Sequence, residues 1–334
     1  MTRRAAAAVA LVTSLLLSRG LSAQGPGSAS PPALEFDSVA DFLTLPDGMN
    51  FGEVSGVAVN SRGHVFVFTR SNSANGPAYA PTAAQLLEFG AKGEFIREVG
   101  KNLYGWSFAH TVRIDRQDNI WAVDKGSDMV IKFDPKGRVR EVYGRRKESA
   151  DEESKPWEHA NPPLPHVDGL FRQPTDVAWD SQGNSYITDG YVNARVAKYD
   201  KHGDWVMSWG EHGSGPGQFN TPHSIVIDRG QTLYVADRQN NRVQTFDTDG
   251  NLKKVWDLDG PPWSLCITPG PNQVVFVGSV GEEGLGDLRG VRHLFQKGPF
   301  KDRITAFITV DSPDMHRIVT GGVVRPGDEI RMQG

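Results

Sequence analysis

His223-Ser-Ile-Val-Ile-Asp228 opens a run of four short apolar segments, each five or six residues long. The second segment is Leu233-Tyr-Val-Ala-Asp237, and the third and fourth cover residues 242–246 and 252–256. Polar or glycine-containing turns separate them, as at residues 247–250. Short apolar or alternating segments bounded by such turns are typical of buried antiparallel strands. This stretch therefore predicts one four-stranded antiparallel sheet.

The first strand of this sheet recurs five times along the chain. Its copies align without a gap as Ser55-Gly-Val-Ala-Val-Asn60, His110-Thr-Val-Arg-Ile-Asp115, Thr175-Asp-Val-Ala-Trp-Asp180, His223-Ser-Ile-Val-Ile-Asp228 and Trp263-Ser-Leu-Cys-Ile-Thr268. The copies start 55, 65, 48 and 40 residues apart, and a second strand follows each of them. Four short strands repeated at this period are typical of propeller blades. We therefore predict an all-β propeller.

The same residues resemble a known repeat. Gly215-Pro-Gly-Gln-Phe219, with Thr221-Pro-His-Ser-Ile225 and Asn240-Asn-Arg-Val-Gln-Thr-Phe246, is similar to the consensus of the NHL repeat. The resemblance implies a six-bladed β-propeller. Residues 281–334 show no good second-strand pattern, so we expect the last blade to be irregular or incomplete.

Three segments divide the chain. Residues 1–23 have the plan of a signal peptide, because Arg3 and Arg4 precede an apolar run and Leu21-Ser-Ala23 offers a cleavage site. We therefore expect export to the periplasm or the extracellular space. Residues 24–46 are expected to form a lead-in, of which 33–46 could supply a strand that closes the ring. Residues 47–334 are assigned to the propeller.

Composition excludes several classes of protein. The chain has 334 residues, a formal net charge of −4 and no basic run, which argues against a nucleic-acid partner. No later window approaches the length of apolar residues that a transmembrane segment needs. Cys266 is the only cysteine, so the fold holds together without disulfides. We expect a monomer.

Two histidines hold the same repeat position. His110 and His223 each stand at the start of a first strand, which in a propeller is the innermost strand and begins at the mouth of the channel. In a six-bladed ring these blades lie about 120° apart, so a third ligand from the last blade would complete a zinc site. His316 lies 53 residues after Trp263 and is the candidate. Hydrogen-bonded histidines that cap the channel are the alternative.

Residues at the end of the second strands share a face with these histidines, because the first two strands of a blade are antiparallel. Arg70, Tyr191 and Arg238 stand there. Guanidinium groups and a phenol beside a cation site suit an anionic substrate, although the charge of Arg238 could instead pair within its blade.

The resemblance narrows to one family on the motifs Val67-Phe-Thr-Arg70, Phe108-Ala-His-Thr111, Asp189-Gly-Tyr-Val-Asn-Ala-Arg195 and Gln218-Phe-Asn-Thr-Pro-His-Ser224. They are similar to those of the peptidyl-α-hydroxyglycine α-amidating lyases. The resemblance implies cleavage of a C–N bond, which releases glyoxylate and an amidated peptide. It implies zinc ligands at His110 and His223, a catalytic tyrosine at Tyr191 and a catalytic arginine at Arg70. The substrate is then a small molecule or peptide with a C-terminal carboxylate.

The sequence departs from this family in its last blade. The family's third zinc histidine is followed by an aspartate near a structural calcium, whereas His316 is followed by Arg317. At the expected third zinc ligand, His316, and at the expected structural calcium site, the family's motif is therefore incomplete.

Two other functions fit a propeller. One is a calcium-dependent hydrolase of the gluconolactonase type, which relies on channel carboxylates; the first strands here begin instead with Ser, His, Thr, His and Trp. The other is an exported propeller without enzymatic activity that binds a peptide or protein, and the irregular last blade favours it.

Overall fold

Strands dominate the described part of the chain, as the repeat predicts. The computed structural model describes residues 39, 41–70, 83–146, 166–258, 260–267, 273 and 275–279, together with two short strands nearer the C-terminus. All of these residues belong to the unit Ala33–Gly334. The predicted signal peptide, residues 1–23, and the predicted zinc ligand His316 lie outside the described residues.

Four antiparallel sheets of four strands each follow one another along the described chain. The first contains β1 (Glu53–Val59), β2 (Val65–Arg70), β3 (Ala84–Phe89) and β4 (Phe95–Val99). The second contains β5 (Ala109–Ile114), β6 (Ile120–Asp124), β7 (Met129–Phe133) and β8 (Val139–Gly144). The third contains β9 (Asp176–Trp179), β10 (Ser185–Asp189), β11 (Arg195–Tyr199) and β12 (Trp205–Trp209). The fourth contains β13 (Pro222–Ile227), β14 (Leu233–Asp237), β15 (Arg242–Phe246) and β16 (Leu252–Asp257).

Two shorter sheets follow. β17 (Pro262–Ile267) pairs with β18 (Val275–Ser279), and β19 (Ile304–Thr305) pairs with β20 (Val323–Val324). The fifth predicted repeat thus forms its first two strands.

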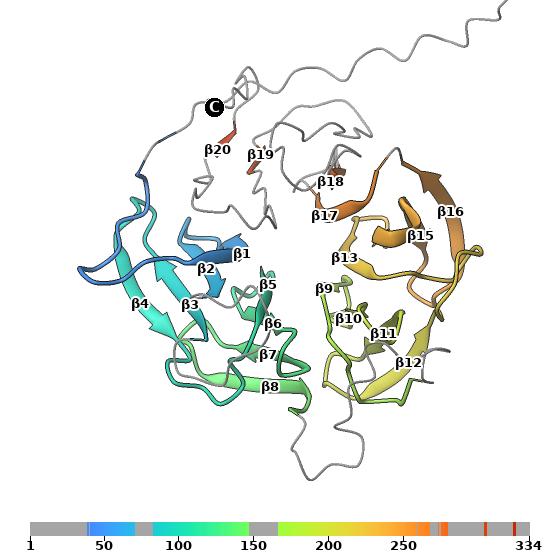
Figure 1. The fold of residues 1–334 in the computed structure, drawn as a ribbon, viewed down its shortest axis with the longest axis horizontal. Helices are drawn as coiled ribbons and strands as arrows, with labels where there is room; N and C mark the ends of the chain where they lie inside the picture. Colours follow the sequence, from blue (N-terminus) through green and yellow to red (C-terminus); the bar gives the residue numbers. More distant parts are fainter. Residues whose placement is uncertain are drawn as a thin grey trace, which may run out of the picture. The chain divides into compact units, whose positions relative to one another are not determined.

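The sheets are arranged as propeller blades. Within each four-stranded sheet the strands lie side by side in sequence order, and Figure 1 shows β1, β5, β9, β13 and β17 nearest the middle with β4, β8, β12 and β16 outermost. Neighbouring inner strands contact one another from β1 through β17. The expected all-β architecture is therefore confirmed.

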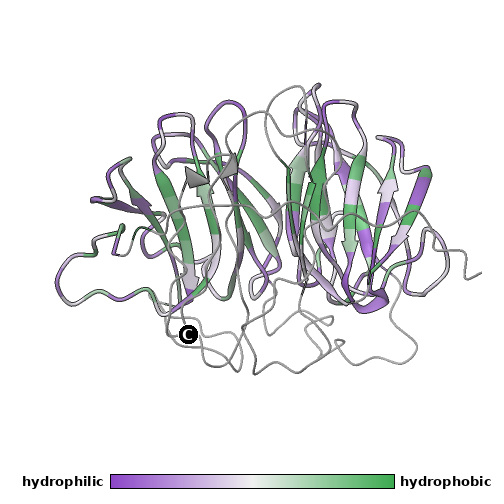
Figure 2. Ribbon diagram, turned by 90° about the horizontal axis from the view of Figure 1, so that it is seen from above, coloured by the Kyte–Doolittle hydropathy of each residue, from purple (hydrophilic) through white to green (hydrophobic). Residues whose placement is uncertain are grey.

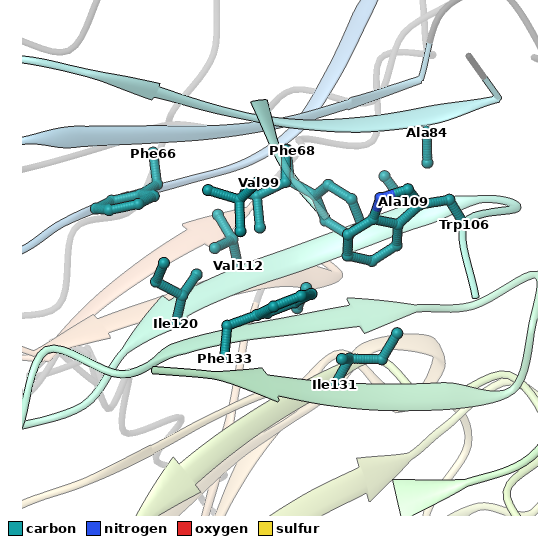
Figure 3. Close-up of a cluster of buried hydrophobic side chains, with 12 residues drawn as sticks. Phe66, Phe68, Ala84, Val99, Trp106, Ala109, Val112, Ile120, Ile131 and Phe133 are labelled. Atoms are coloured by element: carbon teal, nitrogen blue, oxygen red, sulfur yellow. The ribbon is translucent and has the colours of Figure 1, made fainter. Parts of the chain in front are cut away.

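Apolar side chains from adjacent blades fill the space between them. Figure 2 shows the hydrophobic residues concentrated in the strands and the hydrophilic ones at the turns. Between the first two blades, Phe68 of β2 packs with Trp106, Val112 of β5 and Phe133 of β7, all at most 2% exposed (Figure 3). Burial of each such side chain stabilises the fold by roughly 1.5–3 kcal/mol, so blade-to-blade packing holds the inner strands in place.

The described part of the lead-in lies on the outer edge of the first blade. Thr44 forms an isolated parallel bridge with Glu94, and its amide donates to the carbonyl of Gly93 at 2.9 Å. Phe42 and Leu45 pack against the apolar core of the same blade. The expected ring-closing segment covers residues 33–46. Its residues 33–38 and 40 lie outside the described residues.

Helical structure is confined, among the described residues, to the short 3-10 helix η2 (Arg238–Asn240). No helix in that part of the chain has the length and apolar character needed to cross a membrane.

Candidate functional site

Four of the five inner strands of the described blades carry a β-bulge near their beginning. In β1, β5, β13 and β17 the register with the second strand slips by one residue, which leaves an unpaired residue at each slip. The unpaired residues are Ser55, His110, His223 and Trp263. A bulge redirects a side chain away from the alternation of the strand. The two histidines predicted from the repeat are therefore bulge residues of β5 and β13.

The imidazole rings of His110 and His223 lie next to each other and are buried. His110 and His223 are 7% and 8% exposed, and their ring centroids are 4.8 Å apart. The Nδ1 atom of His110 lies 2.7 Å from the carbonyl oxygen of Thr175, and that of His223 lies 2.7 Å from the carbonyl oxygen of Trp263. Because a carbonyl oxygen only accepts, each Nδ1 carries the proton and donates. In the neutral imidazole, Nε2 then holds a lone pair.

Tyr191 joins the two histidines. Its hydroxyl oxygen lies 3.1 Å from Nε2 of His223 and 3.4 Å from Nε2 of His110. A hydroxyl has one proton, so it donates to only one of these two lone pairs at a time. The Nε2 atoms of neutral imidazoles are donors of the type that binds zinc in proteins, and the phenol oxygen lies beside both of them.

Burial and positive charge keep both histidines neutral. Burial lowers the pKa of His110 well below 6.5, with further lowering by the charges of His223, Arg70 and Lys125. The pKa of His223 is lowered to about 3, first by burial and then by the charge of Arg238. The hydrogen bonds to the two carbonyl oxygens work in the opposite direction but are weaker. Neutral imidazole is the form that binds a metal.

These shifts predict acid-sensitive folding. A histidine whose pKa falls from 6.5 to about 3 on folding binds more protons in the unfolded state. Its contribution to stability is complete above pH 6.5 and is lost as the pH falls toward 3. Between pH 6.5 and 4.5, the free energy of unfolding of the metal-free protein should fall more steeply than that of His223→Gln, by up to about 1.4 kcal/mol per pH unit.

Urea titrations at each pH measure this difference, with His202→Gln as the control because His202 is an exposed turn residue. Parallel slopes for wild type and His223→Gln would show that His223 is solvated in the folded state.

The predicted arginine of the first blade lies beside His110. Arg70 donates from Nε to the carbonyl oxygen of Ala109 at 2.8 Å and pairs with Glu53 at 3.2 Å. Its guanidinium carbon lies 4.0 Å from the ring centroid of Phe108. These contacts fix the guanidinium next to the bulge of β5.

Arg238, the other predicted arginine, lies on the side of His223. Its guanidinium carbon is 4.3 Å from the ring centroid of Trp263 and 5.3 Å from that of Tyr191. The structure thus gathers His110, His223, Tyr191, Arg70 and Arg238.

Lys125 is a member of the site that the sequence argument did not single out. Its Nζ lies 3.9 Å from the ring centroid of Tyr191 and 5.2 Å from that of Phe108. The sequence does contain the signal, because Lys125 follows the second strand of its blade at the position that Arg70 and Arg238 hold in theirs.

Buried aspartates fix the loops that lead to the histidines. Asp124, at the end of β6, accepts hydrogen bonds from the backbone amides of Ser107 and Phe108 at 2.9 and 3.0 Å. Asp237, at the end of β14, accepts from the amide of Asn220 at 2.7 Å and from Nε of Arg242 at 2.7 Å. In these two blades the end of the second strand therefore positions the start of the first strand of the same blade.

Gly190 sets the position of Tyr191. A Cβ at Gly190 would lie 2.0 Å from the carbonyl oxygen of Pro222, the residue before His223. That oxygen also accepts from the hydroxyl of Thr175 at 2.7 Å, whose own carbonyl holds His110. Only a residue without a side chain fits between these backbones.

We expect Gly190→Ala to destabilise the protein by about 1–3 kcal/mol, because the inserted methyl group must push backbone atoms apart. The same shift should lower activity, since it moves Tyr191 relative to His223. Thermal unfolding and turnover measure both effects. Gly230→Ala is the matched control: its Cβ would meet only the carboxyl group of Asp228, at 3.1 Å. Equal stability of the two variants would contradict the close approach.

The zinc site and its three ligands remain predictions. Among the described residues no group of three or more His, Cys, Asp or Glu side chains could hold a metal ion. His110 and His223 supply two nitrogen donors there, and His316 lies outside that part of the chain.

Comparison with known proteins supports the fold class. Residues 168–279 match the family described as a 6-bladed beta-propeller. The chain is a six-bladed β-propeller protein, as the sequence predicts.

Proteins with similar sequences include amidating enzymes and an NHL repeat-containing protein. The chain is 32% identical over 259 residues to peptidyl-glycine alpha-amidating monooxygenase of Mus musculus, covering 70% of this chain and 24% of that protein. It is 30% identical to a probable peptidyl-alpha-hydroxyglycine alpha-amidating lyase of Caenorhabditis elegans, covering 58% of this chain and 55% of that protein. It is 38% identical to NHL repeat-containing protein 3 of Mus musculus over 32% of this chain and 30% of that protein.

The resemblance indicated by the sequence motifs is therefore confirmed: homologues carry the names of the amidating lyases and of NHL-repeat proteins. The alignments span about a quarter of the mouse monooxygenase and about half of the nematode lyase.

Proposed function

We propose that this protein is a lyase that cleaves the C–N bond of a peptidyl-α-hydroxyglycine, or a related N-acyl hemiaminal, into an amide and glyoxylate. One observation carries the proposal: the hydroxyl of Tyr191 lies between the unprotonated Nε2 atoms of two buried histidines, 3.1 and 3.4 Å away. Cationic side chains surround this group, which suits a substrate that ends in a carboxylate. The names of the relatives support the same reaction.

Zinc is a metal that imidazole donors fit, and His110 and His223 would hold it through Nε2, with His316 proposed as the third ligand. When bound, zinc supplies a Lewis acid that polarises a substrate oxygen and favours loss of the hydroxyl proton. Both imidazole protons lie on Nδ1, which leaves the Nε2 lone pairs to bind the metal.

The phenol of Tyr191 is the proposed proton acceptor. Positive charge beside its ring, from Lys125 at 3.9 Å and Arg238 at 5.3 Å, favours the phenolate. The phenolate takes the proton of the substrate hydroxyl. As the carbon–oxygen double bond forms, the C–N bond breaks, and its electron pair goes to the amide nitrogen, which takes up the proton that Tyr191 had accepted.

Arg70 is the proposed anchor of the substrate carboxylate. Its guanidinium is fixed by Ala109 and Glu53 before substrate arrives, so the carboxylate meets an oriented donor. The same charge stabilises the negative charge that develops on the hydroxyl oxygen as it loses its proton.

Product identification tests this proposal. The purified mature protein, loaded with zinc, is incubated with an N-acyl-α-hydroxyglycine, and the products are separated by mass. A lyase releases the primary amide and glyoxylate in equal amounts. A hydrolase of the acyl group would release the carboxylic acid instead, and that product would refute the proposal.

A further inference from the structure

Cations from three blades alternate with aromatic rings beside the histidine pair. Lys125 shares the ring of Phe108 with Arg70, at 5.2 and 4.0 Å from the ring centroid. It shares the ring of Tyr191 with Arg238, at 3.9 and 5.3 Å. The ammonium group of Lys125 thus shares one aromatic ring with each of the two guanidinium groups.

One of the two guanidinium groups lies near each histidine. Arg70 donates to the carbonyl of Ala109, the residue before His110. Arg238 lies over the ring of Trp263, whose carbonyl oxygen accepts from His223.

Arg238 carries a buried donor without a partner. Arg238 is only 8% exposed, and its Nε has no hydrogen-bond partner in the described part of the structure. A buried N–H that lacks an acceptor costs about 1–3 kcal/mol, more when the group is charged. A ligand oxygen beside Tyr191 and Trp263 would satisfy it.

Resting on the proposed lyase activity, we infer that the site takes a substrate with two anionic groups, one on each side of the carbon that reacts. The carboxylate of the hydroxyglycine binds at Arg70. The second carboxylate binds at Arg238, with Lys125 between the two. The substrate class is therefore a peptide whose residue before the terminal α-hydroxyglycine is acidic.

Equilibrium binding tests this inference without any reaction. N-acetyl-glutamyl-glycine and N-acetyl-glutaminyl-glycine differ only in one charge, and neither has the hydroxyl group that cleavage requires. Calorimetry on the purified mature protein should show that the glutamyl peptide binds about tenfold more tightly, with the preference shrinking as salt is added.

Variants assign the preference to the proposed residues. Arg238→Gln should bring the ratio of the two affinities close to one, and Lys125→Met should reduce it. Lys201→Met is the matched control because Lys201 is an exposed turn residue of the third blade, and its ratio should equal that of wild type. Thermal unfolding checks that each variant is folded. If Arg238→Gln does not fold, the test rests on Lys125→Met alone, because that variant alters a half-buried side chain.

Equal affinity of wild type for the two peptides would overturn the inference, as would no binding of either. A preference that survives in both Arg238→Gln and Lys125→Met would overturn it as well. The lyase proposal fails separately: a protein that releases no glyoxylate but prefers the glutamyl peptide retains the dianion site and lacks only the chemistry.

Discussion

Tyr191→Phe is expected to lower kcat for glyoxylate release by a factor of about 100 or more while KM changes little. Phenylalanine keeps the ring that packs against His110, His223 and Lys125 but removes the oxygen that accepts the proton. The loss therefore falls on the chemical step rather than on binding. Steady-state kinetics with the zinc content of each preparation measured alongside separate this effect from metal loss.

Tyr234→Phe is the control for that experiment. The hydroxyl of Tyr234 lies 3.1 Å from Asp228, in the turn between the first and second strands of the fourth blade, and it does not touch the histidines. Its loss should cost about 1 kcal/mol of stability and leave kcat unchanged. If Tyr191→Phe and wild type turn over equally fast, Tyr191 is not the proton acceptor.

Removing either histidine should abolish both zinc binding and turnover. His110→Ala and His223→Ala each take away one of the three proposed nitrogen donors, and a site left with two of them should not retain about one zinc per chain. Loss of a Lewis acid worth several kcal/mol predicts a fall in kcat on the order of 10³ or more. Elemental analysis after dialysis and the glyoxylate assay measure the two effects.

His202→Ala is the matched control, since His202 is exposed in the turn between β11 and β12. It should keep wild-type zinc and wild-type turnover. Unchanged zinc in His110→Ala would place the metal elsewhere in the protein.

Much of the fold follows from local pattern. Repeated short strands with polar turns predicted the inner two strands of five blades and the outer strands of the fourth. Periodicity succeeds here because each strand of a blade is bounded by its own turn chemistry, as at the Asp247 to Gly250 turn after β15.

The candidate site was predictable only in part. Repeat position alone selected His110 and His223, because the bulges of β5 and β13 fall at the same register. The tautomers were not predictable, because the carbonyl oxygens of Thr175 and Trp263 that hold Nδ1 come from the next blade and have no sequence signature. Lys125 could have been found from its register, since it aligns with Arg70.

The glyoxylate assay with and without metal tests the central claim most directly. Zinc-loaded wild type should release glyoxylate from an N-acyl-α-hydroxyglycine far faster than the same concentration of free zinc. Chelation should stop the release, and added zinc should restore it. A rate no higher than that of free zinc, in protein that retains its zinc, would contradict the account.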